Sequence, residues 1–164
     1  MNKAVFFDRD GVINNNSHHY YIFKEEQLEI IPEVCKAIKR LQTAGFLIIV
    51  VSNQGGIARG LYDVAHVDRL HSIIQEKMQA EGAHIDDFYF CPHHTKIGKC
   101  LCRKPQPLLL QKALAAHCID ASKSFMIGDS DRDVEAAHRA GIKAFKVESN
   151  TSAMPIVDKI LHSL

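Results

Sequence analysis

This chain of 164 residues contains no tryptophan, no block of like charge and no long apolar run. Its 20 basic and 19 acidic residues leave a formal charge of +1, which argues against a surface that binds long nucleic acids. No apolar run approaches the roughly 20 residues that cross a bilayer, and the N-terminus lacks the pattern of a signal peptide. We therefore expect a cytoplasmic protein without a membrane or nucleic-acid partner, which leaves small anionic substrates open.

The sequence also contains no repeats and no low-complexity tracts, and no domain-sized insertion separates Asp8 from Ser52 or Ser52 from Lys104. The chain is 46% hydrophobic, long enough for one domain with a core and too short for two ordinary ones. We therefore expect residues 1–164 to form a single, monomeric domain. Disulfides are not expected in a reducing compartment, so the five cysteines should bind metal or be buried. Cys35 and Cys118 fall on helical patterns and are interpreted as buried apolar residues.

Strand patterns alternate with helical patterns along the whole chain. The run at 46–51 is continuously apolar and the run at 124–127 is apolar after Ser124, as in strands buried on both faces, and the amphipathic stretch 64–81 lies between them. This alternation predicts an α/β fold with a parallel sheet covered by helices on both faces. The other expected elements are a helix from Pro32, strands at 88–90 and 144–147, and helices at 108–117, 134–140 and 155–164.

Polar side chains stand where three of the apolar runs stop. One run ends in Asp8 and Asp10, a second in Ser52 and a third in Asp129. Open α/β sheets bind ligands at the carboxyl ends of their strands, so these groups should lie at one site. Asp8 and Asp10 are two positions apart and can face one phosphate. An Asp-x-Asp pattern alone would fit an acidic turn equally well. The other motifs therefore decide between an acidic turn and a catalytic site.

Two cations, Arg103 and Lys104, come between the second and third of these motifs. The chain thus contains, in order from Asp8 to Asp133, a pair of carboxylates, a hydroxyl, a pair of cations and a second acidic cluster. This order resembles the four motifs of the haloacid dehalogenase superfamily of phosphatases. The resemblance implies a Rossmann-like fold, and the lack of a large insertion between the motifs implies a capless member with a rim built from short segments.

The resemblance also implies roles in the hydrolysis of a phosphate monoester. Asp8 would attack phosphorus to form an aspartyl-phosphate, and Asp10 would protonate the leaving oxygen and later activate water. Ser52 and the amide of Asn53 would bind a phosphoryl oxygen, while Lys104 would neutralise the charge on it.

Carboxylates beside a phosphate need a hard cation, and oxygen ligands favour Mg²⁺. By the resemblance, the ligands are Asp8, the backbone carbonyl of Asp10, and Asp129. Asp133 has two interpretations of equal weight. It either supports Asp129 or a metal-bound water, or it is an acid favoured by the dipole at the start of a helix.

A second metal site is predicted in a cysteine-rich stretch. Cys91, His93, Cys100 and Cys102 offer three thiolates and one imidazole, a set that suits a structural Zn²⁺, with His94 as an alternative nitrogen ligand. The stretch ends directly before the two cations, so a bound zinc would fix where those cations point.

The combination Asp-Arg-Asp-Gly, Asn-Gln-Gly-Gly-Ile-Ala-Arg-Gly, Cys-Pro-His-His and Cys-x-Cys-Arg-Lys-Pro resembles one branch of the superfamily. That branch holds the heptose-bisphosphate phosphatases and the histidinol-phosphate phosphatase domain. Gly-Ile-Ala-Arg-Gly is closer to the heptose enzymes, and Arg103 matches a position that contacts substrate in them. We expect hydrolysis of the 7-phosphate of D-glycero-D-manno-heptose 1,7-bisphosphate. Two departures weaken this choice: the stretch between His93 and Cys100 is short, as in the histidinol-phosphate type, and Ser130 stands where some heptose enzymes have a substrate-binding lysine. Histidinol phosphate is the alternative substrate.

The segment 14–23 and the cysteine-rich stretch are expected to form the rim, although a solvated loop would also fit the first of them. The expected substrate-binding residues are Asn53, Gln54, Arg103, His18 and His19.

Two other classes of protein fit the sequence less well. A zinc-dependent nucleic-acid-binding module would explain the cysteines but not the acidic motifs. A receiver-like protein phosphorylated on Asp8 without turnover would share the fold but would lack the acid/base group that Asp10 supplies.

Overall fold

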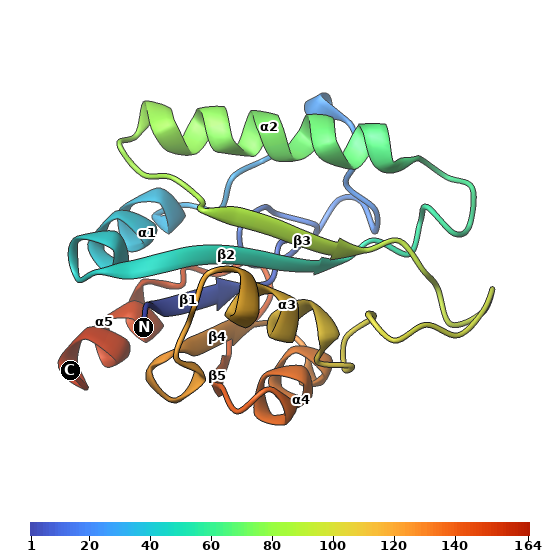
Figure 1. The fold of residues 1–164 in the computed structure, drawn as a ribbon. Helices are drawn as coiled ribbons and strands as arrows, with labels where there is room; N and C mark the ends of the chain where they lie inside the picture. The colour runs from blue at the N-terminus through green and yellow to red at the C-terminus, as the bar shows by residue number, and fades with distance from the viewer.

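A computed structural model describes residues 1–164, and a five-stranded parallel sheet in the order β3-β2-β1-β4-β5 forms its centre (Figure 1). The expected parallel α/β sheet is therefore confirmed. The strands are β1 (Lys3–Phe7), β2 (Phe46–Asn53), β3 (Asp87–Cys91), β4 (Phe125–Gly128) and β5 (Lys143–Lys146).

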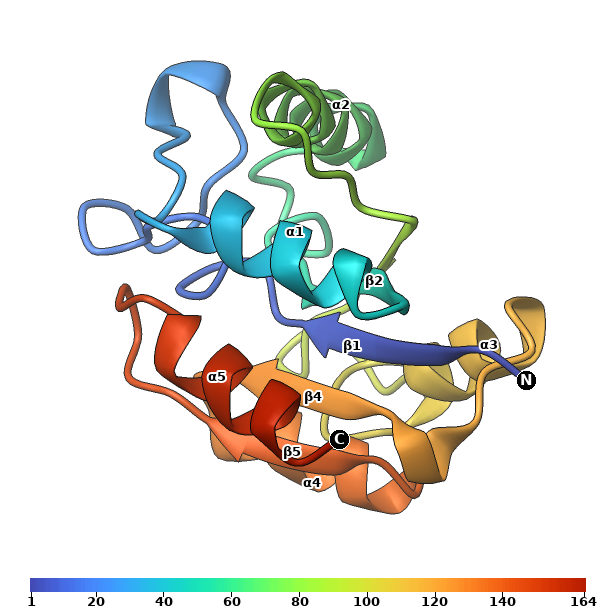
Figure 2. The ribbon, with the colours of Figure 1, turned by 90° about the vertical axis from the view of Figure 1, so that its left-hand side faces the viewer.

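Alternating side chains of the central strand supply both faces of the sheet with core residues. Val5 and Phe7 belong to one apolar cluster, and Ala4 and Phe6 to the other; all four are buried. Helices cover both faces (Figure 2). The first face carries α1 (Val34–Thr43), α2 (Val64–Ala80) and α5 (Met154–His162), and the second carries α3 (Leu108–Ala116) and α4 (Asp131–Arg139).

The strand order places a crevice between β1 and β4. From β1 the chain adds β2 and β3 on one side, and then continues with β4 and β5 on the other. Ligands of open α/β sheets bind where the order reverses in this way. Strand β4 pairs with β1, and the amide of Asp8 donates to the carbonyl of Ile127 at 3.0 Å. The residues that follow β1 and β4 therefore lie side by side at this crevice.

Two sequence expectations need correction. Helix α4 begins at Asp131 and not at Val134, because the Ser130 side chain accepts from the amide of Asp133 and caps a turn that apolar periodicity does not reveal. Cys118 is exposed and not buried, since the chain adopts φ 49° there after α3. Cys35 is half-buried.

Long connections lie beyond the carboxyl ends of the strands. The segment between β1 and α1 contains a 3-10 turn at Glu25–Gln27, and the segment between β3 and α3 extends past the sheet (Figure 1). Another 3-10 turn, Ala121–Lys123, precedes β4. None of the helices combines the length and apolar character needed to span a membrane.

Candidate active site

A cavity of about 260 Å³ opens at the crevice between β1 and β4. It is lined almost entirely by polar and charged side chains, as a site for a small polar anion requires. The lining residues that the sequence predicted are Asp8, Asp10, Ser52, Asn53, Arg103, Lys104, Asp129 and Asp133.

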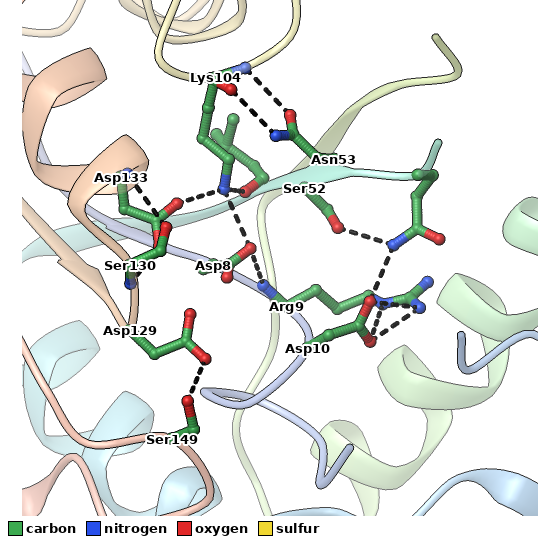
Figure 3. A network of polar contacts seen from close by, with 12 residues as sticks. Asp8, Arg9, Asp10, Ser52, Asn53, Lys104, Asp129, Ser130, Asp133 and Ser149 are labelled. Atoms are coloured by element: carbon green, nitrogen blue, oxygen red, sulfur yellow. Dashed lines mark hydrogen bonds and ion pairs between the residues drawn. The ribbon is translucent and has the colours of Figure 1, made fainter. Parts of the chain in front are cut away.

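Lys104 is a buried cation held between two carboxylates (Figure 3). Its Nζ lies 3.0 Å from Asp8 Oδ1 and 2.6 Å from Asp133 Oδ1, and it donates to the carbonyl of Val51 at 2.6 Å. Burial opposes the charged amine, but the two carboxylates outweigh burial and hold the pKa of Lys104 above its usual value. The ammonium is thus fixed and charged beside Asp8.

Asp8 lies where three carboxylates converge. Burial raises the pKa of Asp8 well above its usual value, Lys104 opposes the rise, and the charges of Asp133 and Asp129 add to it. One carboxylate oxygen from each of these aspartates lies within 4.8 Å of the others. Such a group of hard oxygen atoms, with only one ammonium to balance it, fits a divalent cation such as Mg²⁺.

Two glycines make this convergence possible. Gly11 has φ 86°, and a Cβ added there would lie 2.2 Å from Asp129 Oδ2. At Gly128 an added Cβ would lie 2.3 Å from the Cβ of Asp133. Any side chain at either position would therefore push apart the acidic groups of the site.

The contacts of Asp133 match one of its two expected interpretations, that of an acid at the start of a helix. Its Oδ2 accepts hydrogen bonds from the amide of Ser130 at 3.1 Å and from the Ser130 hydroxyl at 2.9 Å, which completes a helix cap. Its other oxygen holds Lys104, a partner that the sequence did not suggest. Asp129 instead accepts from the Ser149 hydroxyl at 2.7 Å.

Ser52, Asn53 and Gln54 follow one another at the end of β2 but have different surroundings. Ser52 lines the cavity, and its hydroxyl accepts from Gln54 Nε2 at 2.7 Å. The Asn53 side chain bonds both backbone groups of Lys104, at 3.0 and 3.1 Å. Gln54 is buried and does not line the cavity; it also donates to Asp10 at 3.1 Å. Its expected contact with substrate is thus replaced by contacts to two site residues.

The four zinc ligands predicted from the sequence lie together. Their Sγ and Nδ1 atoms are all within 4.8 Å of one another, and the closest pairs are 3.1 to 3.7 Å apart. Ligands of tetrahedral zinc are separated by roughly 3.5–3.8 Å at Zn–S of about 2.3 Å and Zn–N of about 2.0 Å. The donor set therefore fits zinc, and it consists of Cys91, His93, Cys100 and Cys102, without the alternative His94.

The same cluster positions Arg103. Its backbone amide donates to Cys100 Sγ at 3.4 Å, and its Nη1 donates to the carbonyl of His93 at 3.1 Å. The guanidinium has no carboxylate partner and lines the cavity.

The segment 14–23 contributes to the rim as expected, but its two histidines do not. His18 and His19 line a separate hollow near Glu26 and Glu29, so the structure does not bring them to the cavity. The residues of the same segment that line the cavity between β1 and β4 are Asn16, Tyr20 and Tyr21. Sequence reasoning also missed Arg132, which lies in the first turn of α4 that apolar periodicity does not reveal, and Ser149, which lies in a turn after β5.

Comparisons with known proteins identify relatives of this chain. The HAD-hydrolase-like family model matches residues 101–159. D-glycero-beta-D-manno-heptose-1,7-bisphosphate 7-phosphatase of Rhodopseudomonas palustris is 40% identical over 151 residues, which cover 88% of this chain and 83% of that protein. The histidine biosynthesis bifunctional protein HisB of Baumannia cicadellinicola is 34% identical over 99% of this chain and 46% of that protein.

A solved structure extends the similarity to three dimensions. The D,D-heptose 1,7-bisphosphate phosphatase from B. bronchiseptica, crystallised with magnesium and phosphate, superposes with a TM-score of 0.89 and is 27% identical. The match covers 99% of both chains. Sequence relatives, superposition and the cluster of aspartates around Lys104 lead to one assignment. This chain belongs to the haloacid dehalogenase superfamily and is a phosphoric monoester hydrolase.

Proposed function

We propose that this enzyme is a Mg²⁺-dependent phosphatase that works through an aspartyl-phosphate on Asp8. The observation that carries the proposal is the position of Asp8 at the end of β1, with its side chain 14% exposed and beside a fixed ammonium and two further carboxylates. Mg²⁺ would be held by Asp8, Asp129 and the backbone carbonyl of Asp10, and it would supply the positive charge that lets a phosphate approach these acids.

The residues of the cavity divide the reaction between them. A carboxylate oxygen of Asp8 forms a bond to phosphorus while the bond to the alkoxide oxygen breaks, and Asp10 gives that oxygen its proton. Asp10 then takes a proton from water, whose oxygen displaces Asp8 and releases phosphate. Ser52, the amide of Asn53 and Lys104 bind the phosphoryl oxygens throughout.

We further propose the 7-phosphate of D-glycero-D-manno-heptose 1,7-bisphosphate as the group removed. Relatives named for this reaction share 35–40% identity with the chain. The cavity suits a hydroxyl-rich sugar because its lining is polar, and it offers two guanidinium groups without carboxylate partners, Arg103 and Arg132. Either group can bind a second phosphate while the first lies at Asp8.

Histidinol phosphate is the second candidate substrate. The sequence alignment with HisB covers 99% of the chain, whereas that with the Rhodopseudomonas palustris heptose enzyme covers 88%. The zinc cluster is proposed to serve either substrate, because its effect is to fix Arg103 and the turn that carries Lys104.

The test is a comparison of substrates with the purified enzyme and its Asp8→Asn variant. We expect phosphate release from the heptose bisphosphate to exceed that from histidinol phosphate, to stop with EDTA and to return with Mg²⁺. Asp8→Asn should abolish turnover with unchanged circular dichroism, because an amide is neither a nucleophile nor an anionic ligand. Near-normal turnover by Asp8→Asn would refute the mechanism, and a preference for histidinol phosphate would refute the substrate.

A further inference from the structure

Arg9 separates the two aspartates of the first motif, and its side chain is completely buried. A buried guanidinium is costly unless each of its N–H groups has a partner. Its only carboxylate partner is Asp10, whose side chain is 20% exposed toward the cavity. The guanidinium therefore lies in the protein interior, on the side of Asp10 that faces away from Asp8 and Lys104 (Figure 3).

The guanidinium of Arg9 forms hydrogen bonds with both carboxylate oxygens of Asp10. Nε donates to Asp10 Oδ1 at 3.0 Å, while Nη2 donates to Oδ1 at 2.9 Å and to Oδ2 at 3.2 Å. Asn14 and Gln54 add one amide donor to each oxygen, at 3.0 and 3.1 Å. A planar fork of this kind fixes the rotation of a carboxylate as well as its position.

The guanidinium of Arg9 also contacts two groups on the side away from Asp10. Nη2 donates to the carbonyl of Ile22 at 2.6 Å, and Nη1 lies 3.3 Å from His71 Nε2. His71 comes from α2, is buried and stacks on Phe88 with ring centroids 4.4 Å apart. Burial, and then the charge of Arg9, lower the pKa of His71 to about 3, so the ring is neutral and its Nε2 can accept the hydrogen bond.

We propose that Arg9, anchored by His71 and the Ile22 carbonyl, is a positioning residue that holds Asp10 toward the leaving-group oxygen. The inference rests on the proposed role of Asp10 as the acid. A lysine at position 9 would keep the charge but could not bond both carboxylate oxygens and both anchors at once. The carboxylate would then turn away from the leaving group, with the fold and the positive charge retained.

Leaving groups separate positioning from a general structural effect. A poor alkoxide leaving group needs the proton of Asp10, whereas p-nitrophenolate does not. The parameter to compare is kcat/KM, because it covers the steps through departure of the leaving group and omits the later hydrolysis of the phosphoenzyme. We expect Arg9→Lys to lower kcat/KM for the heptose bisphosphate by roughly ten- to a hundredfold, and for p-nitrophenyl phosphate by less than about threefold.

The double variant Arg9→Lys/Asp10→Asn tests whether Arg9 acts through Asp10. Its ratio of kcat/KM values for the two substrates should equal that of Asp10→Asn alone, because no acid remains to be positioned. Arg40→Lys is the matched control, since Arg40 forms an exposed pair with Asp158 and should leave the ratio unchanged. If Arg9→Lys does not fold, His71→Phe keeps the stack on Phe88 and removes only the acceptor, and it should shift the ratio in the same direction.

The following results would overturn the proposal. Equal losses on both substrates would make Arg9 a structural residue only. Additive losses in the double variant would show an action independent of Asp10. If Asp10→Asn itself shows no dependence on the leaving group, the role of Asp10 falls together with the proposal. If Asp10→Asn shows the dependence and Arg9→Lys does not, only the proposal on Arg9 fails.

Discussion

Replacing Asp133 by asparagine should destabilise the enzyme, because this side chain serves two partners in a buried place. Its Oδ1 lies 2.6 Å from Lys104 Nζ, and its Oδ2 accepts two hydrogen bonds from Ser130. An amide has one oxygen, so it can accept either from Lys104 or from Ser130. Whichever way the amide turns, its NH₂ group faces a donor, and one buried donor loses its acceptor.

The expected cost is about 2–4 kcal/mol in the free energy of unfolding. Breaking a buried ion pair costs roughly 3–5 kcal/mol, and losing a hydrogen bond to a charged group costs roughly 1.5–3 kcal/mol. The cost should be below the top of this range because Lys104 keeps Asp8 at 3.0 Å and the carbonyl of Val51. For a chain of this length, the melting temperature should fall by roughly 5–15 °C.

Urea unfolding in buffer without Mg²⁺ and without chelator measures this cost without a contribution from bound Mg²⁺, and it leaves the proposed zinc in place. Asp131→Asn is the matched control, because Asp131 lies in the same first turn of α4 but its side chain is 93% exposed and pairs with Lys146. That variant loses the same charge near the helix dipole and should change stability by less than about 0.5 kcal/mol. Equal losses in the two variants would refute the reasoning, since they would leave only the shared dipole effect.

Two further predictions concern the cysteine-rich stretch. Arg103→Ala should lower kcat/KM for the bisphosphate by roughly ten- to a hundredfold, the scale of a lost contact worth about 1.5–3 kcal/mol, and leave p-nitrophenyl phosphate nearly unchanged. Equal losses in kcat/KM on both substrates would mean that Arg103 contacts the transferred phosphoryl group. Elemental analysis should find about one zinc per chain, lost in Cys100→Ser and kept in Cys118→Ser, whose cysteine lies outside the cluster. Full zinc content in Cys100→Ser would remove it from the ligand set.

The sequence predicted the parts of the site that stand at strand ends. Continuous apolar runs identify buried parallel strands, and parallel strands bring their carboxyl ends to one edge. Asp8, Ser52 and Asp129 could therefore be placed together before their distances were known. The cysteine cluster was equally predictable, because its four donors are close in sequence and have no competing periodic pattern.

The directions of the rim side chains, and the buried residues that contact Asp10 from the protein interior, could not be predicted in this way. His18 and His19 belong to a segment without regular structure, where spacing along the chain says nothing of direction. The burial of Arg9 depends on His71, which is 62 positions away and has no pattern linking it to Arg9. A charged residue between two aspartates would ordinarily be expected to face solvent.

Asp133 has one partner that its sequence position indicates, the start of α4, and one that the sequence does not indicate, Lys104. The Ser-x-x-Asp spacing from Ser130 matches a helix cap, a local signal that could have placed the start of α4 correctly. Lys104 comes from a distant loop, so only the folded chain reveals the second contact. Since one carboxylate caps α4 and holds the ammonium beside Asp8, any shift of the first turn of α4 must also move Lys104. The start of this short helix therefore lines the cavity that we propose as the phosphate site and does not only support it.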